Sequence, residues 1–164
     1  SAFSGKGSTL SPGQTGKFRQ DNSMYSGGST GLAILRRDGF ASMNAGVQEK
    51  VLLTKPLVFE GQDLYVNVDN PKGELKIEIL DMSGNIIHPY TTENCRLINT
   101  NQSKLKVLWS GEENLSRLNG LPVKFRFKMK SGKLYSFWVS SSKNGASKGF
   151  TAAGGPGISG PIDD

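Results

Sequence analysis

Residues 123–130, Val-Lys-Phe-Arg-Phe-Lys-Met-Lys, alternate strictly between apolar and cationic side chains. Successive side chains of a β-strand point to opposite faces, so this alternation predicts a strand with one buried and one charged face. On this interpretation the buried face carries Val123, Phe125, Phe127 and Met129, and the charged face carries Lys124, Arg126, Lys128 and Lys130.

Three other stretches repeat the pattern: residues 63–69, 74–80 and 104–109. Turn residues separate them at 70–73, 83–85 and 131–132, and only 110–120 has room for a short helical turn. The sequence therefore predicts an all-β fold, an antiparallel two-sheet β-sandwich of the jelly-roll or concanavalin-like type, with about eight to ten strands. The residues that we expect to be buried between the sheets are Leu64, Val66, Val68, Leu75, Ile77, Ile79, Val107, Phe125 and Phe127.

The ends of the 164-residue chain differ in composition from its centre. Both are rich in Gly, Ser and Thr and lack alternation, and overall hydrophobic content is only 35%. We therefore expect a Gly/Ser-rich N-terminal arm at 1–31, the β-sandwich domain at 32–142 and a Gly-rich C-terminal arm at 143–164. Three Gly-X-Y triplets at 154–162 are too few for a collagen triple helix, and they are better explained as part of that arm.

Charge and cysteine content narrow the classes of partner. A net charge of +6 suits an anionic partner, but it does not choose between nucleic acid and an acidic polysaccharide. The single cysteine excludes an internal disulfide and a cysteine zinc site, and we expect no cofactor or metal.

No apolar run is long enough for a membrane span. The chain starts Ser-Ala-Phe without methionine, which suggests a processed fragment, and we expect a secreted protein.

The residues that could carry catalysis do not form a recognisable group. The only histidine, His88, has no triad partners in the sequence, and Glu74 and Glu78 lie on one predicted strand face around Lys76, as on any solvated surface. Residues 5–9, Gly-Lys-Gly-Ser-Thr, lack the spacing of a phosphate loop. Glycoside hydrolysis needs two carboxyl groups at a set separation. No such pair can be identified in the sequence, so we expect no enzymatic activity.

The strongest candidate site is a predicted basic hairpin at 122–139. A two-residue turn at 131–132 places Tyr135 and Phe137 beside the cations, whereas a three-residue turn at 130–132 buries them and exposes Trp138. We favour the second because it buries more apolar surface. The expected glycan-binding residues are then Lys124, Arg126, Lys128 and Trp138, since a ring between cations can stack on a sugar. The alternative is a solvated outer face or one covered by another domain.

An ordered series of motifs resembles a known accessory domain. It comprises residues 25–46 (YSGGSTGLAILRRDGFASMNAG), 52–87 (LLTKPLVFEGQDLYVNVDNPKGELKIEILDMSGNII), 107–111 (VLWSG) and 121–139 (LPVKFRFKMKSGKLYSFWV). Over about residues 25–140 the chain is similar to the C-terminal β-sandwich that follows the five-bladed propeller of glycoside hydrolase family 32-like proteins. The resemblance implies that the catalytic carboxylates belong to an adjacent propeller, outside this chain. With this resemblance we expect a polysaccharide partner, preferably acidic, rather than nucleic acid.

The same resemblance bears on Arg36-Arg37-Asp38. Those enzymes carry an Arg-Asp-Pro motif in the propeller, whereas Gly39 follows Arg37-Asp38 here, so we assign Asp38 no catalytic role. We expect a strand at 31–37, a turn or bulge at 38–39 and a strand at 40–46, with charges that could brace a neighbouring domain. The function we expect is a non-catalytic module that supports a propeller and binds glycans; the alternative is an independent adhesion module for sulfated polysaccharides.

Overall fold

The computed structural model describes residues 33–112, 114–150 and 160–164, and in these residues the fold is all-β. The sandwich lies within Leu35–Asp164, one of two units into which the chain divides. Its strands are β1 (Met43–Ala45), β2 (Lys50–Leu53), β3 (Asp63–Asp69), β4 (Glu74–Leu80), β5 (Asn101–Lys106), β6 (Lys124–Lys130) and β7 (Gly132–Ser140). One 3₁₀ turn, η1, spans Ser116–Leu118. The seven strands of the described residues are fewer than the eight to ten expected for the chain.

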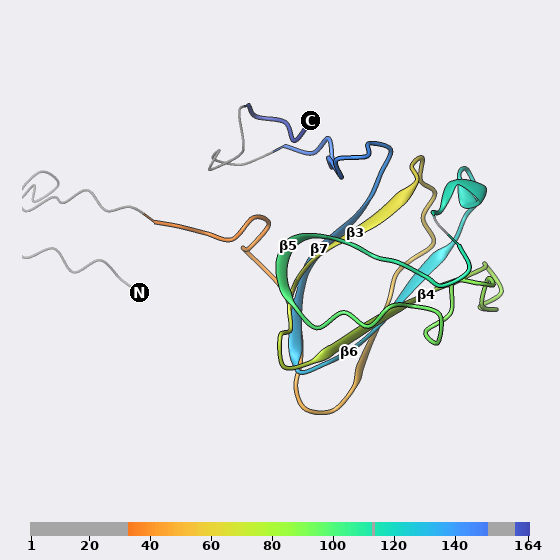
Figure 1. Ribbon diagram of the computed structural model, residues 1–164, viewed down its shortest axis with the longest axis horizontal. Helices are drawn as coiled ribbons and strands as arrows, with labels where there is room; N and C mark the ends of the chain where they lie inside the picture. Colours follow the sequence, from red (N-terminus) through yellow and green to blue (C-terminus); the bar gives the residue numbers. More distant parts are fainter. Residues whose placement is uncertain (1–32, 113, 151–159) are drawn as a thin grey trace, which may run out of the picture. The chain divides into compact units, whose positions relative to one another are not determined.

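The strands form two antiparallel sheets that pack face to face (Figure 1). One has the order β1-β7-β3-β5 and the other β2-β6-β4, so every connection along the chain crosses from one sheet to the other. This alternation is the jelly-roll arrangement, and it confirms the predicted two-sheet sandwich. Beside β4, isolated bridges from Ile86 and Ile98 take the place of a further strand.

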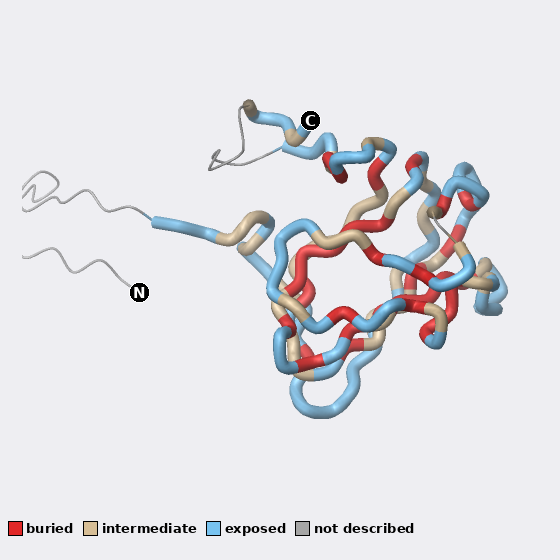
Figure 2. Tube along the Cα trace, viewed as in Figure 1, coloured by how far each residue is buried: buried red, intermediate tan, exposed pale blue. Residues whose placement is uncertain are grey.

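The core fills the space between the sheets, where the buried parts of the strands face one another (Figure 2). All nine residues expected there are buried, as predicted, although Tyr65 and Asn67 on the opposite face of β3 are buried as well. Phe127 packs against Phe137 of the opposite sheet with ring centroids 4.9 Å apart. Each buried aromatic or aliphatic side chain contributes about 1.5–3 kcal/mol, so these strands hold the sandwich together.

The segment before β1 is less regular than expected. Residues 33–36 form no strand, and the turn at Arg36–Gly39 closes with a 2.8 Å hydrogen bond from Gly39 N to Arg36 O. Asp38 has φ 50°, in the left-handed region, which Asp tolerates better than most residues. The predicted turn is confirmed, whereas the strand at 31–37 is wrong for its described residues. The expected arm at 1–31 lies outside the described residues.

The described parts of the expected C-terminal arm, residues 143–150 and 160–164, make specific contacts. The Trp138 indole N–H donates to Gly145 O at 3.0 Å, and the Ser140 hydroxyl donates to Ala146 O at 2.6 Å. Phe150 and Ile162 form a bridge with each other. These contacts place residues 145–146 against β7.

In the described chain no helix has the length and apolarity needed to cross a membrane.

Candidate functional site

The structure separates the four residues of the predicted glycan site. Lys124, Arg126 and Lys128 project from the outer face of β6 in the three-stranded sheet, whereas Trp138 belongs to β7 in the four-stranded sheet. The expectation that the cations share a face with Trp138 is therefore wrong.

The reason is the connection between β6 and β7. Only Ser131 lies between them, with φ 51°, and its N–H donates to Gly46 O at 2.7 Å. The chain turns a corner there and enters the opposite sheet, so neither the two-residue nor the three-residue hairpin forms. β6 pairs instead with β2 and β4, and β7 pairs with β1 and β3. Alternation alone could not distinguish a hairpin from a corner, because both preserve the period of two.

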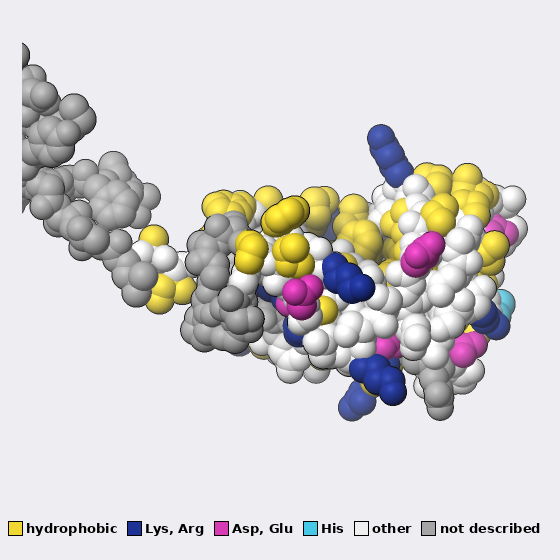
Figure 3. Space-filling view, turned by 90° about the horizontal axis from the view of Figure 1, so that it is seen from above, with side chains coloured by type: hydrophobic (Ala, Val, Ile, Leu, Met, Phe, Trp, Pro, Cys, Tyr) yellow, Lys and Arg dark blue, Asp and Glu magenta, His cyan; other side chains and the backbone are white. Residues whose placement is uncertain are grey.

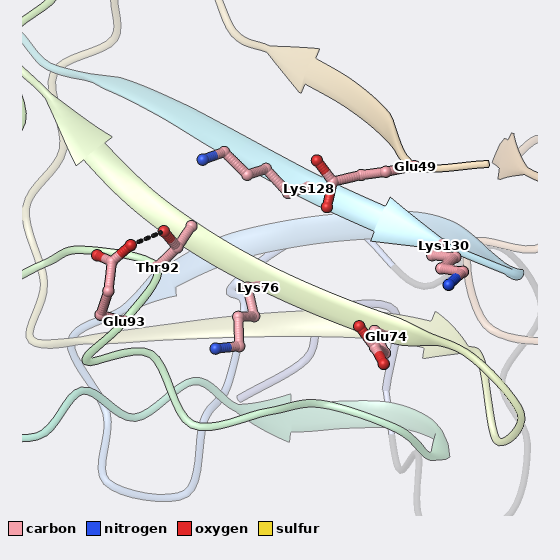
Figure 4. A pocket seen from close by; sticks show the side chains of 7 residues that line it. All are labelled: Glu49, Glu74, Lys76, Thr92, Glu93, Lys128 and Lys130. Atoms are coloured by element: carbon pink, nitrogen blue, oxygen red, sulfur yellow. Dashed lines mark hydrogen bonds between the residues drawn. The ribbon is translucent and has the colours of Figure 1, made fainter.

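The outer face of the three-stranded sheet carries a shallow hollow of about 230 Å³ (Figure 4). Thr92 and Glu93 lie at one end, towards which the side chains of Lys76 and Lys128 extend, and Glu74 and Lys130 lie at the other end. We call this feature the charged hollow; its lining residues are Glu49, Glu74, Lys76, Thr92, Glu93, Lys128 and Lys130.

Strand register explains how these charges meet. Across β4 and β6, Glu74 is paired with Lys130, Lys76 with Lys128, and Glu78 with Arg126. The first and third pairs have opposite charges, but the middle pair places two lysines directly opposite each other. Like charges in this position repel each other, although the lining as a whole carries three lysines and three carboxylates.

Glu78 differs most from the sequence prediction. Expected on a solvated face, it is 0% exposed. Its Oε1 accepts a 2.6 Å hydrogen bond from Arg126 and lies 3.4 Å from the Lys128 ammonium, while Oε2 has no hydrogen-bond partner. A buried carboxylate needs paired cations, so Glu78 fixes Arg126 and Lys128 beside the charged hollow.

Glu93 stays charged at the other side of the hollow. Hydrogen bonds from its own backbone N–H and from the Thr91 and Thr92 hydroxyls lower the pKa of its carboxyl group, and the Lys128 charge acts in the same direction. The Thr92 hydroxyl donates to Glu93 at 3.1 Å. The charged hollow thus offers ammonium donors and carboxylate acceptors within one small volume, as polyhydroxylated ligands with acidic groups require.

Trp138 lies on the outer face of the other sheet and is half-buried, because other side chains of the domain pack on its ring. The ring stacks on Tyr65 with centroids 5.7 Å apart and 14° between the planes, and the Arg37 guanidinium lies 5.1 Å from the indole centroid. Gly145 packs so closely on Tyr65 that an added Cβ would lie 2.6 Å from the ring. The indole is therefore already occupied by contacts within the domain, which compete with stacking on a sugar.

Arg36 and Arg37, which precede Asp38 in the stretch compared with the Arg-Asp-Pro motif, make their contacts within this domain. Arg36 donates to Asn67 at 2.5 Å and to Val68 O at 2.8 Å, and its guanidinium lies over Tyr135 at 4.9 Å. Arg37 pairs with Asp163 at 2.6 Å. Neither set of partners could be predicted from the sequence, because no local pattern links residue 36 to residue 67 or residue 37 to residue 163.

The remaining candidates do not assemble into a second site. Within the described ranges, no three His, Cys, Asp or Glu side chains are grouped as metal ligands. His88 is exposed, and the Asp38 carboxylate accepts a hydrogen bond from Ser136 at 2.7 Å. On the face in Figure 3, basic and acidic side chains are scattered among each other, and hydrophobic side chains gather along one margin.

No protein-family model, curated protein or solved structure gives a match to this chain. The resemblance to family 32-like sandwiches therefore stays an expectation that rests on the motifs quoted above.

Proposed function

We propose that this chain is a non-catalytic β-sandwich module that binds acidic glycans in the charged hollow. The observation that carries the proposal is the direct opposition of Lys76 and Lys128 on neighbouring strands. An anionic group placed between the two ammonium groups lessens their repulsion, in addition to the contact that Lys128 already makes with Glu78 at 3.4 Å.

The rest of the charged hollow suits the other groups of a sugar. The carboxylates of Glu74 and Glu93 can accept hydrogen bonds from sugar hydroxyls, while Lys130 adds a further donor at the far end. A volume of about 230 Å³ is small, so it suits one or two units of a polymer rather than a whole ligand. We expect weak binding that strengthens when several modules engage one chain.

The carboxyl groups whose pKa values are shifted all have lowered values, which supports a non-catalytic role. A glycosidase general acid needs a raised pKa, so that it holds a proton at neutral pH. The pKa values of Asp81, Glu93 and Asp163 are all lowered. Hydrogen bonds from Asn85 are the main cause at Asp81. These groups are anions at neutral pH and serve as acceptors.

The test is retention of the full chain on immobilised heparin, compared with a neutral glycan. We expect retention on heparin alone, weakening with salt, because the interaction is between exposed charges. Lys76→Gln should reduce retention clearly, whereas the matched change Lys72→Gln, at an exposed turn outside the hollow, should not. Trp138→Ala should keep its retention where it stays folded. If Lys76→Gln elutes with the unaltered chain, the charged hollow is not the binding site.

A second candidate function is support of a neighbouring propeller domain in a secreted, family 32-like protein. Phe40 and Phe150 are 84% and 85% exposed, and contact with a neighbouring domain would remove these large apolar side chains from water. Titrating the chain with the remainder of its full-length precursor, produced separately, tests this role by calorimetry. The double variant Phe40→Ser and Phe150→Ser should bind more weakly than the unaltered chain.

A further inference from the structure

The edge strand β2 carries backbone groups without a strand partner. It is the last strand of its sheet, and among the described residues it pairs only with β6. Thr54, just after β2, donates its N–H to Phe125 O of β6 at 3.0 Å. Alternate residues of an antiparallel strand bond to the same neighbour, so Val51 and Leu53 direct their N–H and C=O groups towards the free edge.

The side chains on the same strand face are exposed. Val51 and Leu53 pair with the outward-facing Lys128 and Arg126, and they are 57% and 51% exposed. Glu49 and Lys55 continue this face by the alternation of side chains, and both are exposed. A free edge with apolar side chains is a template for pairing with another strand, and many proteins avoid leaving one open.

The sequence of this edge is complementary to itself. In an antiparallel pair of identical strands centred on Leu52, Val51 lies opposite Leu53 of the second copy, and Glu49 lies opposite its Lys55. The two-fold axis repeats both contacts, which gives two ion pairs and two apolar pairs, and it places no like charges opposite each other.

Backbone geometry selects the same register. The residues with free N–H and C=O groups, Val51 and Leu53, must pair with each other to form hydrogen bonds, and centring on Leu52 pairs them. A shift by one residue would place Val51 and Leu53 opposite residues whose N–H and C=O groups point towards β6, so no hydrogen bonds could form between the two copies. A shift by two places Glu49 opposite Leu53 or Leu57 of the second copy and loses both ion pairs.

We propose that two copies of this chain associate through antiparallel pairing of β2 about Leu52, which joins two three-stranded sheets into one of six strands. The seam is short, so association is weak and depends on concentration. Self-association is a different activity from glycan binding, although Glu49 also lines the charged hollow, and its test therefore contains no glycan.

The experiment is sedimentation velocity of the full chain up to near-millimolar concentration, with a charge-swap series. Glu49→Lys and Lys55→Glu each turn both ion pairs into repulsions, so each should weaken dimerisation about tenfold, and the double variant should restore it. Matched controls with the same charge changes at exposed positions away from β2 are Glu60→Lys and Lys72→Glu. These should dimerise like the unaltered chain.

Two outcomes overturn the proposal. One is a chain that stays monomeric over the whole concentration range. The other is a dimer that the single swaps do not weaken, or that the double variant does not restore, because association then uses another surface or register. Circular dichroism of each variant separates loss of pairing from loss of folding.

Discussion

The guanidinium of Arg37 lies 2.6 Å from the carboxylate of Asp163, although 126 residues separate them in the chain. The same guanidinium lies 5.1 Å from the Trp138 ring, and the Asp163 carboxylate also accepts the Ser147 N–H at 2.7 Å. One ion pair therefore ties the turn before β1 to the C-terminal residues of the domain. The guanidinium groups of Arg36 and Arg37 therefore stabilise contacts inside this domain.

The Arg37–Asp163 contact should weaken in acid. Partial burial alone would raise the pKa of Asp163, but hydrogen bonds from Arg37 and Ser147, with the Arg37 charge, hold it at about 2, below the ordinary value of 3.8. The folded chain thus favours the ionised form. The stabilisation is complete above about pH 4, contributes roughly 1–2 kcal/mol, and is lost as the pH falls towards 2. Tryptophan fluorescence through an acid titration measures it.

Asp163→Asn provides the control for that titration. It removes the titrating group, so the fluorescence change between pH 4 and pH 2 should shrink in the variant, and the variant at pH 7 should resemble the unaltered chain in acid. Identical acid transitions in the two proteins would show that other carboxyl groups cause the effect.

Glu78→Gln should destabilise the domain strongly. The amide keeps the shape of the side chain but leaves Arg126 and Lys128 without their buried counter-charge, so we expect the free energy of unfolding to fall by about 2–4 kcal/mol. Glu74→Gln, on the same strand face but exposed, should change it by less than about 0.5 kcal/mol. Urea unfolding of both variants measures the difference. Equal effects would mean that Glu78 is less buried in solution.

Gly145→Ala should release the C-terminal contacts of β7. Gly145 has φ 75° and lies against Tyr65, so the added methyl group meets both a strained backbone and a ring 2.6 Å away. Gly84→Ala is the matched control, since Gly84 has φ 91° with no atom within 4 Å of the added Cβ. The control should cost about 1 kcal/mol and Gly145→Ala clearly more. Proteolysis after Lys143 and Lys148 should be faster in the Gly145 variant alone.

Lys76→Gln should leave the domain as stable as before, or more stable by up to about 0.5 kcal/mol, because it removes the repulsion with Lys128. Thermal unfolding at low salt measures the change most directly, since salt screens exposed charges. A clear loss of stability would indicate that Lys76 has a supporting contact in the folded domain and would weaken the case for an open anion site.

The sequence by itself determined which apolar residues of the strands enter the core and which class of fold results. Val123, Phe125 and Phe127 alternate with cations, and only a strand with one face in the core satisfies that order. The corresponding runs at 63–69 and 74–80 require a second layer to cover them. These are local consequences of side-chain period, so they could be predicted without knowing any partner strand.

Only the tertiary structure decided which strands are neighbours and therefore which charges meet. A single residue, Ser131, sends the chain into the other sheet, separates Trp138 from Lys128 and places Lys128 opposite Lys76. The burial of Glu78 and the Arg37–Asp163 pair arise in the same way, from segments distant in the chain. The period of a strand fixes the face on which a side chain lies, but the side chain's partners depend on long-range pairing that local patterns do not encode.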